Sequence, residues 1–145
     1  MAFKMIRNFP QKYFFIFSNN AVGSLEHQVI SGLRIALTLV MEEVDLSLFF
    51  LEKGVHLVKK KEPIKSQKSN NQSNFEKNQK SEEDNALNPH ELIEGLLSFG
   101  AKIMTCQSSL ETEGIAEDDL LDGVEISTLY NATIIIQESN KILSF

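Results

Sequence analysis

Residues 13–50, YFFIFSNNAVGSLEHQVISGLRIALTLVMEEVDLSLFF, contain two strand-like runs separated by a helix-like run. Tyr13–Phe17 is aromatic and β-branched and ends in Ser-Asn-Asn, which is typical of a buried strand followed by a turn, and Val44–Phe50 resumes the strand pattern. Between them Ser24 is the expected N-cap of a helix. Its apolar residues recur at helical spacing: Leu25, Val29, Leu33, Ala36, Leu37 and Val40. The stretch therefore predicts a βαβ unit with parallel strands and a right-handed crossover.

The same alternation continues in the second half of the chain. Asn88 is expected to cap a helix, with Pro89 at its first position and Gly100 at its end. Four further elements are predicted: a strand at 101–106 (AKIMTC), a short acidic helix at 117–123 (EDDLLDG), a further helix at 125–132 (EISTLYNA) and a terminal strand at Thr133–Gln137 (TIIIQ). Strands that are apolar almost throughout indicate a parallel sheet covered by helices on both faces, and hence an α/β fold.

The segment from Lys59 to Ala86 differs in composition from the rest of the chain. It is poor in apolar residues and rich in Lys, Ser, Asn, Gln and Glu, so it cannot bury enough surface to offset the entropy of ordering. We therefore expect a flexible low-complexity insert at about residues 59–86, within a single domain that spans residues 1–145.

Charge and composition exclude several classes of protein. The net charge is −6, and the insert carries a local excess of lysine, so the remainder is distinctly acidic, which argues against nucleic acid as a partner. One cysteine excludes an intramolecular disulfide and favours a reducing cytoplasm. No apolar run approaches the roughly 20 residues that span a bilayer, so no stable membrane insertion is expected. Since the sequence shows neither a phosphate-binding glycine loop nor metal-ligand spacing, we expect neither a cofactor nor a metal ion.

The single cysteine, Cys106, falls where a predicted strand gives way to Gln-Ser-Ser. Sites in open parallel sheets lie at the carboxyl ends of the strands, and a helix that starts there would favour the thiolate. Such a thiolate can act as a nucleophile or carry sulfur. His56 follows the second strand and could approach the same end of the sheet. The alternatives are that Cys106 is a small buried hydrophobic residue and that His56 is a surface residue.

The second half of the chain resembles the DsrE/DsrF-like sulfur-relay family, in particular its peroxiredoxin-like DsrE branch. The similarity is carried by a "G-x-K-hydrophobic" strand, "C-Q-x-S", a "G-I" step and "L-x-D-G-V-E", matched here by Cys106, Gln107, Ser109, Gly114, Ile115, Leu121, Asp122, Gly123, Val124 and Glu125. The first half is similar more loosely, through FIFSNN and VDLSLFFLEKGVHLVKK.

This resemblance implies a fold, an assembly and a role for the cysteine. The fold is a three-layer α/β/α domain of flavodoxin-like general type, with a mostly parallel sheet of about five strands. The assembly is a homotrimer or a hexamer. Cys106 would take up sulfur as a persulfide, and we expect Gln107, Ser108, Ser109 and His56 to bind the substrate beside it.

Two functions follow from these observations. In the first, the protein is a sulfur carrier or sulfurtransferase-like component whose partners are sulfur donor and acceptor proteins or small sulfur compounds. With no second cysteine in the chain, release must go to a thiol on another molecule. In the second, the protein is a non-catalytic assembly module in which Cys106 is structural. A hydrolase or oxidoreductase with its own cofactor is the third alternative.

Overall fold

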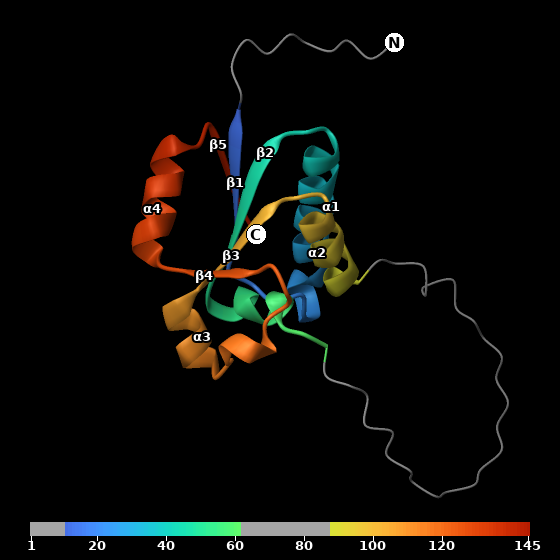
Figure 1. Ribbon diagram of the computed structural model, residues 1–145. Coiled ribbons are helices and arrows are strands. Elements are labelled where there is room, and N and C mark those ends of the chain that lie inside the picture. Colours follow the sequence, from blue (N-terminus) through green and yellow to red (C-terminus); the bar gives the residue numbers. More distant parts are fainter. Residues whose placement is uncertain (1–10, 62–87) are drawn as a thin grey trace, which may run out of the picture.

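A computed structural model describes residues 11–61 and 88–145, which form a five-stranded parallel sheet with helices on both faces (Figure 1). Every neighbouring pair is parallel, and the strand order is β4-β3-β2-β1-β5. The strands are β1 (Lys12–Phe17), β2 (Asp45–Phe50), β3 (Lys102–Cys106), β4 (Glu125–Ser127) and β5 (Lys141–Ser144). The α/β class and the flavodoxin-like layering predicted from the sequence are thus confirmed.

The helices form two unequal layers. Helices α1 (Glu26–Met41) and α2 (Pro89–Ser98) lie together on one face of the sheet, and α4 (Leu129–Glu138) lies alone on the other (Figure 1). The short helix α3 (Gln107–Glu113) follows β3 at the end of the sheet where the strands finish. Among residues 11–61 and 88–145, no helix has the length and apolar character that crossing a membrane requires.

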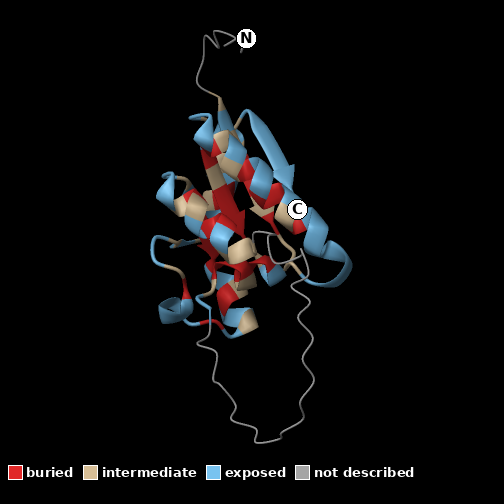
Figure 2. Cartoon of the chain, turned by 90° about the vertical axis from the view of Figure 1, so that its right-hand side faces the viewer, coloured by how far each residue is buried: buried red, intermediate tan, exposed pale blue. Residues whose placement is uncertain are grey.

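The two-residue period of the strands divides the core between these layers. Phe15 and Phe17 of β1 are fully buried in the larger cluster, with α1 and α2, whereas Phe14 belongs to a smaller cluster on the α4 side. The smaller cluster consists of Phe14, Phe49, Met104, Cys106 and Ala132. Buried positions recur along α1 and α2 and gather on the strands behind them (Figure 2). The face under α4 is therefore the thinner half of the core.

The local sequence correctly predicts the start of α2 but not that of α1. The Asn88 side chain accepts a hydrogen bond from the Glu91 N–H at 2.9 Å and Pro89 opens α2, as predicted. The expectation that Ser24 caps α1 is wrong. Ser24 lies in a single 3-10 turn, Gly23–Leu25, and α1 begins at Glu26 without a side-chain cap.

The C-terminal assignment also requires correction. Residues 133–137 lie in α4, and the terminal strand is β5, while the predicted helix at 125–132 is divided between β4 and the start of α4. The Thr128 side chain accepts from the Asn131 N–H at 3.1 Å, which caps α4. Ala132, Ile135 and Ile136 then face the sheet at helical spacing, and this burial overrides the strand preference of the isoleucines. The predicted acidic helix at 117–123 is only a 3-10 turn, Glu117–Asp119.

The start of the predicted insert belongs to the folded body. Lys59 forms an antiparallel bridge with Leu120, and the Lys60 N–H donates to the Asp119 carbonyl at 2.7 Å. The boundary is therefore later than the predicted residue 59, because these backbone hydrogen bonds fix residues that composition alone assigns to the insert. Residues 62–86 of the predicted insert lie outside the described residues.

Candidate functional site

Cys106 is the last residue of β3 and directly precedes α3. Strand β3 lies inside the sheet between β2 and β4, and its register places Cys106 beside Ser127, the last residue of β4. The first residues of α3 and of α4 consequently meet at the carboxyl ends of adjacent strands. This is the position that the sequence predicted for the thiol.

Hydrogen bonds from α3 act on the thiol of Cys106. The Ser108 Oγ lies 3.1 Å from the Cys106 Sγ. Burial of the sulfur would raise its pKa, but the hydroxyl groups of Ser108 and Ser109 and the backbone N–H groups of both residues outweigh burial and lower the pKa of Cys106 below its ordinary 9.0. The site thus favours the thiolate, the form that reacts as a nucleophile.

A cavity of about 210 Å³ opens beside the cysteine. Its wall comes from two elements, α3 and the start of α4, and the lining residues are Cys106, Gln107, Ser108, Glu111, Thr128 and Leu129. The Cys106 residue itself is only 1% exposed, so it forms part of the inner wall of the cavity. A space of this size can admit a small sulfur compound.

Not all residues predicted for the site face this cavity. The Gln107 and Ser108 side chains line it, as expected for a binding site. The Ser109 Oγ instead accepts a hydrogen bond from the backbone N–H of Glu52 at 2.8 Å, although Ser109 also contributes to the lowered pKa of the thiol. His56 is directed elsewhere, because its Nε2 lies 2.9 Å from the Glu113 Oε2 at the far end of α3.

Thr128, Leu129 and Glu113 were not singled out as site residues from the sequence. The first two are not indicated because a single predicted helix at 125–132 hides the strand end at Ser127 and its alignment with Cys106. Glu113 lies in an acidic stretch of the sequence, and its local pattern is the same as that of a solvated helix face. A Thr directly before an apolar helical pattern was the available signal for the cap at Thr128.

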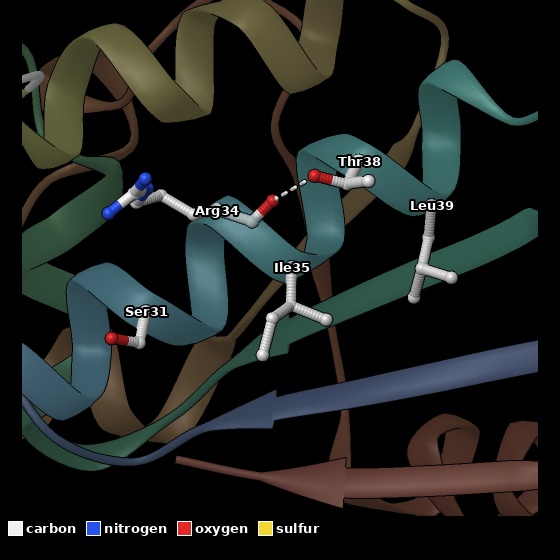
Figure 3. A pocket seen from close by; sticks show the side chains of 5 residues that line it. All are labelled: Ser31, Arg34, Ile35, Thr38 and Leu39. Carbon is white, nitrogen blue, oxygen red and sulfur yellow. Dashed lines mark hydrogen bonds between the residues drawn. The ribbon is translucent and has the colours of Figure 1, made fainter.

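A second cavity, of about 420 Å³, lies along α1 and is larger than the one at Cys106 (Figure 3). It is lined by Ser31, Arg34, Ile35, Thr38 and Leu39. The Thr38 hydroxyl donates to the Arg34 carbonyl at 2.9 Å, so it is engaged within the helix. Its lining contains no thiol, no carboxylate and no imidazole. Among the described residues, no group of three or more His, Cys, Asp or Glu side chains could hold a metal ion.

Comparison with known proteins identifies a matching family and a shared fold. The sequence profile of the DsrE/DsrF-like family matches residues 11–145. Among relatives, the uncharacterized protein MJ0989 of Methanocaldococcus jannaschii is 27% identical over 120 residues, covering 83% of this chain and 89% of the relative. The uncharacterized protein MK0008 of Methanopyrus kandleri is 26% identical over 120 residues, covering 83% and 84%.

Two solved structures share the fold. The ychN protein of E. coli superposes with a TM-score of 0.67 at 22% identity. The match covers 94% of this chain and 100% of the ychN chain. The protein MTH1491 of Methanobacterium thermoautotrophicum superposes with a TM-score of 0.57 at 18% identity, covering 92% and 98%. At these identities the structures support the fold alone.

Proposed function

Because the chain belongs to the DsrE/DsrF-like family, we propose that Cys106 is a sulfur-carrying nucleophile, which holds sulfane sulfur as a persulfide and passes it to a partner thiol. One observation carries the proposal. The only cysteine of the chain lies at a small cavity and receives hydrogen bonds from Ser108 and Ser109 that lower the pKa of its thiol. A buried cysteine that served packing alone would need neither the donors nor the cavity.

The proposed reaction proceeds in two balanced steps. The Cys106 thiolate attacks the outer sulfur of a persulfide or polysulfide donor, a new S–S bond forms, and the donor's S–S bond breaks as its thiolate leaves with the electron pair. An acceptor thiolate then attacks the outer sulfur of the Cys106 persulfide and releases the Cys106 thiolate. No external oxidant or reductant is consumed. Since the chain has no other cysteine, the acceptor thiol belongs to another molecule.

Side chains around the cavity have defined roles in this proposal. Ser108 and Ser109 stabilise the thiolate before attack and again when it departs as a leaving group. Gln107 presents an amide at the cavity wall that can hydrogen-bond a polar donor molecule. His56 supports α3 in place of binding substrate, because its Nε2 contacts the Glu113 carboxylate.

A homo-oligomer is the second part of the proposal, and the exposed apolar surface on the α4 side supports it. Tyr130 is 76% exposed and Leu129 is 54% exposed, and Ile142 of β5, which pairs with Phe14 of the smaller cluster, is also open to solvent. Leu129 borders the Cys106 cavity as well. A closed trimer, or a hexamer built from trimers, would cover this surface and bring Cys106 close to a subunit boundary. The same surface would serve the alternative function, a non-catalytic assembly module.

Mass spectrometry after incubation with polysulfide separates the two functions. For the carrier we expect the peptide containing Cys106 to gain one sulfur atom, and a small thiol acceptor to remove it. Cys106→Ser provides the matched control and should show no gain. An unmodified wild-type peptide with every polysulfide, persulfide and thiosulfate donor tested would contradict the carrier and favour the assembly module.

A further inference from the structure

The placement of α3 decides where the donors to the Cys106 thiol point. The helix has seven residues, Gln107–Glu113, and contains Ser108, whose Oγ lies 3.1 Å from the Cys106 Sγ, and Ser109, which also lowers the pKa of the thiol. A helix of this length is not stable by itself in water, so its position depends on contacts with the rest of the fold. The contacts that hold α3 are therefore part of the environment of the thiol.

The first of these contacts joins the start of α3 to a 3-10 helix, η2 (Glu52–Val58). The backbone N–H of Glu52 donates to the Ser109 Oγ at 2.8 Å. Because the Ser109 oxygen accepts this bond, its hydrogen is free for donation to the thiolate. Glu52 adopts a left-handed backbone conformation with φ of 50°, which costs a non-glycine residue about 1 kcal/mol or more. In this conformation the Glu52 N–H is directed toward the Ser109 Oγ.

The second contact joins the far end of α3 to the same 3-10 helix. Glu113 Oε1 lies 2.8 Å from the Lys53 Nζ, and Glu113 Oε2 lies 2.9 Å from the His56 Nε2. Both carboxylate oxygens are thus engaged, and the Glu113 side chain is only 14% exposed. Such a two-sided arrangement fixes the direction of the carboxylate as well as its position.

The η2 helix is itself fastened to the sheet and can act as a fixed support. The Leu51 N–H, directly before η2, donates to the Phe17 carbonyl at the end of β1 at 3.0 Å. Gly54 approaches the same carbonyl so closely that a Cβ at this position would overlap its oxygen. Helix α3 is therefore held at both ends against an element that cannot shift easily.

We propose that Glu113 is a positioning residue for Cys106: by fastening the far end of α3 to Lys53 and His56, it keeps the Ser108 hydroxyl beside the sulfur. This inference rests on the proposed function, in which Cys106 acts as the nucleophile. The seven residues of α3 span about 10 Å, so the carboxylate acts through the helix and not by contact with the thiol.

Loss of the Glu113 carboxylate has two opposite effects on the thiol, and this makes the inference testable. As a negative charge, the carboxylate disfavours a nearby thiolate, so its removal alone would lower the pKa of Cys106. As an anchor, it supports the donors that stabilise the thiolate, so its removal would raise that pKa. The sign of the change therefore distinguishes positioning from direct electrostatics.

The experiment measures the rate of Cys106 alkylation by iodoacetamide from about pH 5 to about pH 10 in the full chain, before and after Glu113→Ala. The midpoint of the profile reports the pKa of the thiol, and the plateau at high pH reports its accessibility. We expect the midpoint to rise and the rate at about pH 7 to fall about three- to tenfold. A merely structural change that opened or closed the cavity would move the plateau and leave the midpoint in place.

Glu111→Ala is the matched control, because it makes the same substitution two positions earlier in α3. Glu111 is exposed and lines the Cys106 cavity, and it forms no ion pair among the described residues. Its removal should lower the midpoint by the direct effect of charge. A midpoint for Glu113→Ala that stays unchanged or falls in the same way would overturn the inference.

A second variant protects the test against misfolding. If Glu113→Ala does not unfold cooperatively, Glu113→Gln replaces it in the test. This variant keeps the shape of the side chain and one acceptor oxygen, and it weakens the contacts with Lys53 and His56. A raised midpoint of the alkylation profile supports the inference, and an unchanged or lowered midpoint overturns it. Alkylation does not depend on sulfur transfer. A raised midpoint together with a failure to take up sulfur would therefore count against the proposed function while leaving the role of Glu113 in place.

Discussion

The Cys106 thiol is buried in the α4 side of the core, yet hydrogen bonds bias it toward its charged form. Among the residues that produce this bias, Ser108 makes a direct contact, with its Oγ 3.1 Å from the Sγ. For Ser108→Ala we expect the pKa of Cys106 to rise, and alkylation below the ordinary pKa of 9.0 to slow about threefold or more, because one donor to the thiolate is lost while burial remains.

Ser98→Ala provides the control for this change, since the Ser98 hydroxyl is exposed and donates only to the Glu94 carbonyl within α2. It should leave the alkylation profile as in the wild type. An equal slowing in both variants would show that the Ser108 hydroxyl has no particular effect on the thiol.

A pair of glycines tests the packing that supports the site. A Cβ at Gly54 would overlap the Phe17 carbonyl oxygen, whereas a Cβ at Gly95 would meet the Leu37 Cδ1 at an ordinary 3.5 Å. We expect Gly54→Ala to lower the free energy of unfolding by about 2 kcal/mol or more, through forced displacement of η2 from β1. Gly95→Ala, inside α2, should raise it by about 0.5 to 1 kcal/mol. Urea unfolding measures both, and a similar stability for the two variants would contradict this account.

At the scale of elements, the sequence predicts what depends on local patterns. The strand, helix and strand of residues 13–50 and the cap at Asn88 follow from apolar spacing and from one side chain, and they were predicted. The helix at 133–137 was not, because three isoleucines favour a strand until the Thr128 cap and the burial of Ala132 are known.

The candidate site shows the same division between local and long-range information. The place of Cys106 at a strand end is a local feature, and the sequence predicted it. The contact of His56 with Glu113 joins side chains 57 positions apart in the chain, and nothing in the local pattern indicates it. Thr128 and Leu129, at the start of α4, line the cavity because of the β3–β4 register, which is likewise a property of the assembled sheet.

The tie between α3 and η2 should weaken in acid. The hydrogen bond from Lys53, followed by that from His56, lowers the pKa of the Glu113 carboxyl below its ordinary 4.5. The folded state therefore favours the carboxylate. The stabilisation is fully present above pH 4.5 and is lost as pH falls through the folded-state pKa. We expect the difference in Tm between wild type and Glu113→Ala to shrink from about pH 6 to about pH 3. The difference between wild type and Glu111→Ala should change less, and a constant difference for Glu113→Ala would contradict the assignment.

At the scale of the whole molecule, the two faces of the sheet are covered unequally. Helices α1 and α2 bury the larger cluster, while α4 alone covers the other face (Figure 1). All four residues of β5 are exposed, and the strand lies at the edge of the sheet. An edge strand and an adjoining apolar surface favour association with another chain. The cavity at Cys106 borders this surface through Leu129, so we expect association to change access to the thiol.

Light scattering over a dilution series tests the proposed assembly. We expect a mass of three or six chains at micromolar concentration, because stable obligate interfaces bury roughly 2,000 Å² or more in total and are rich in apolar groups. Tyr130→Glu places a charge at the most exposed aromatic residue of α4 and should shift the mass toward that of one chain. Met41→Glu is the control, since Met41 is 59% exposed at the end of α1, in the layer on the opposite face of the sheet. A single-chain mass for the wild type at all concentrations would contradict the assembly, and the α4 surface would then need another partner.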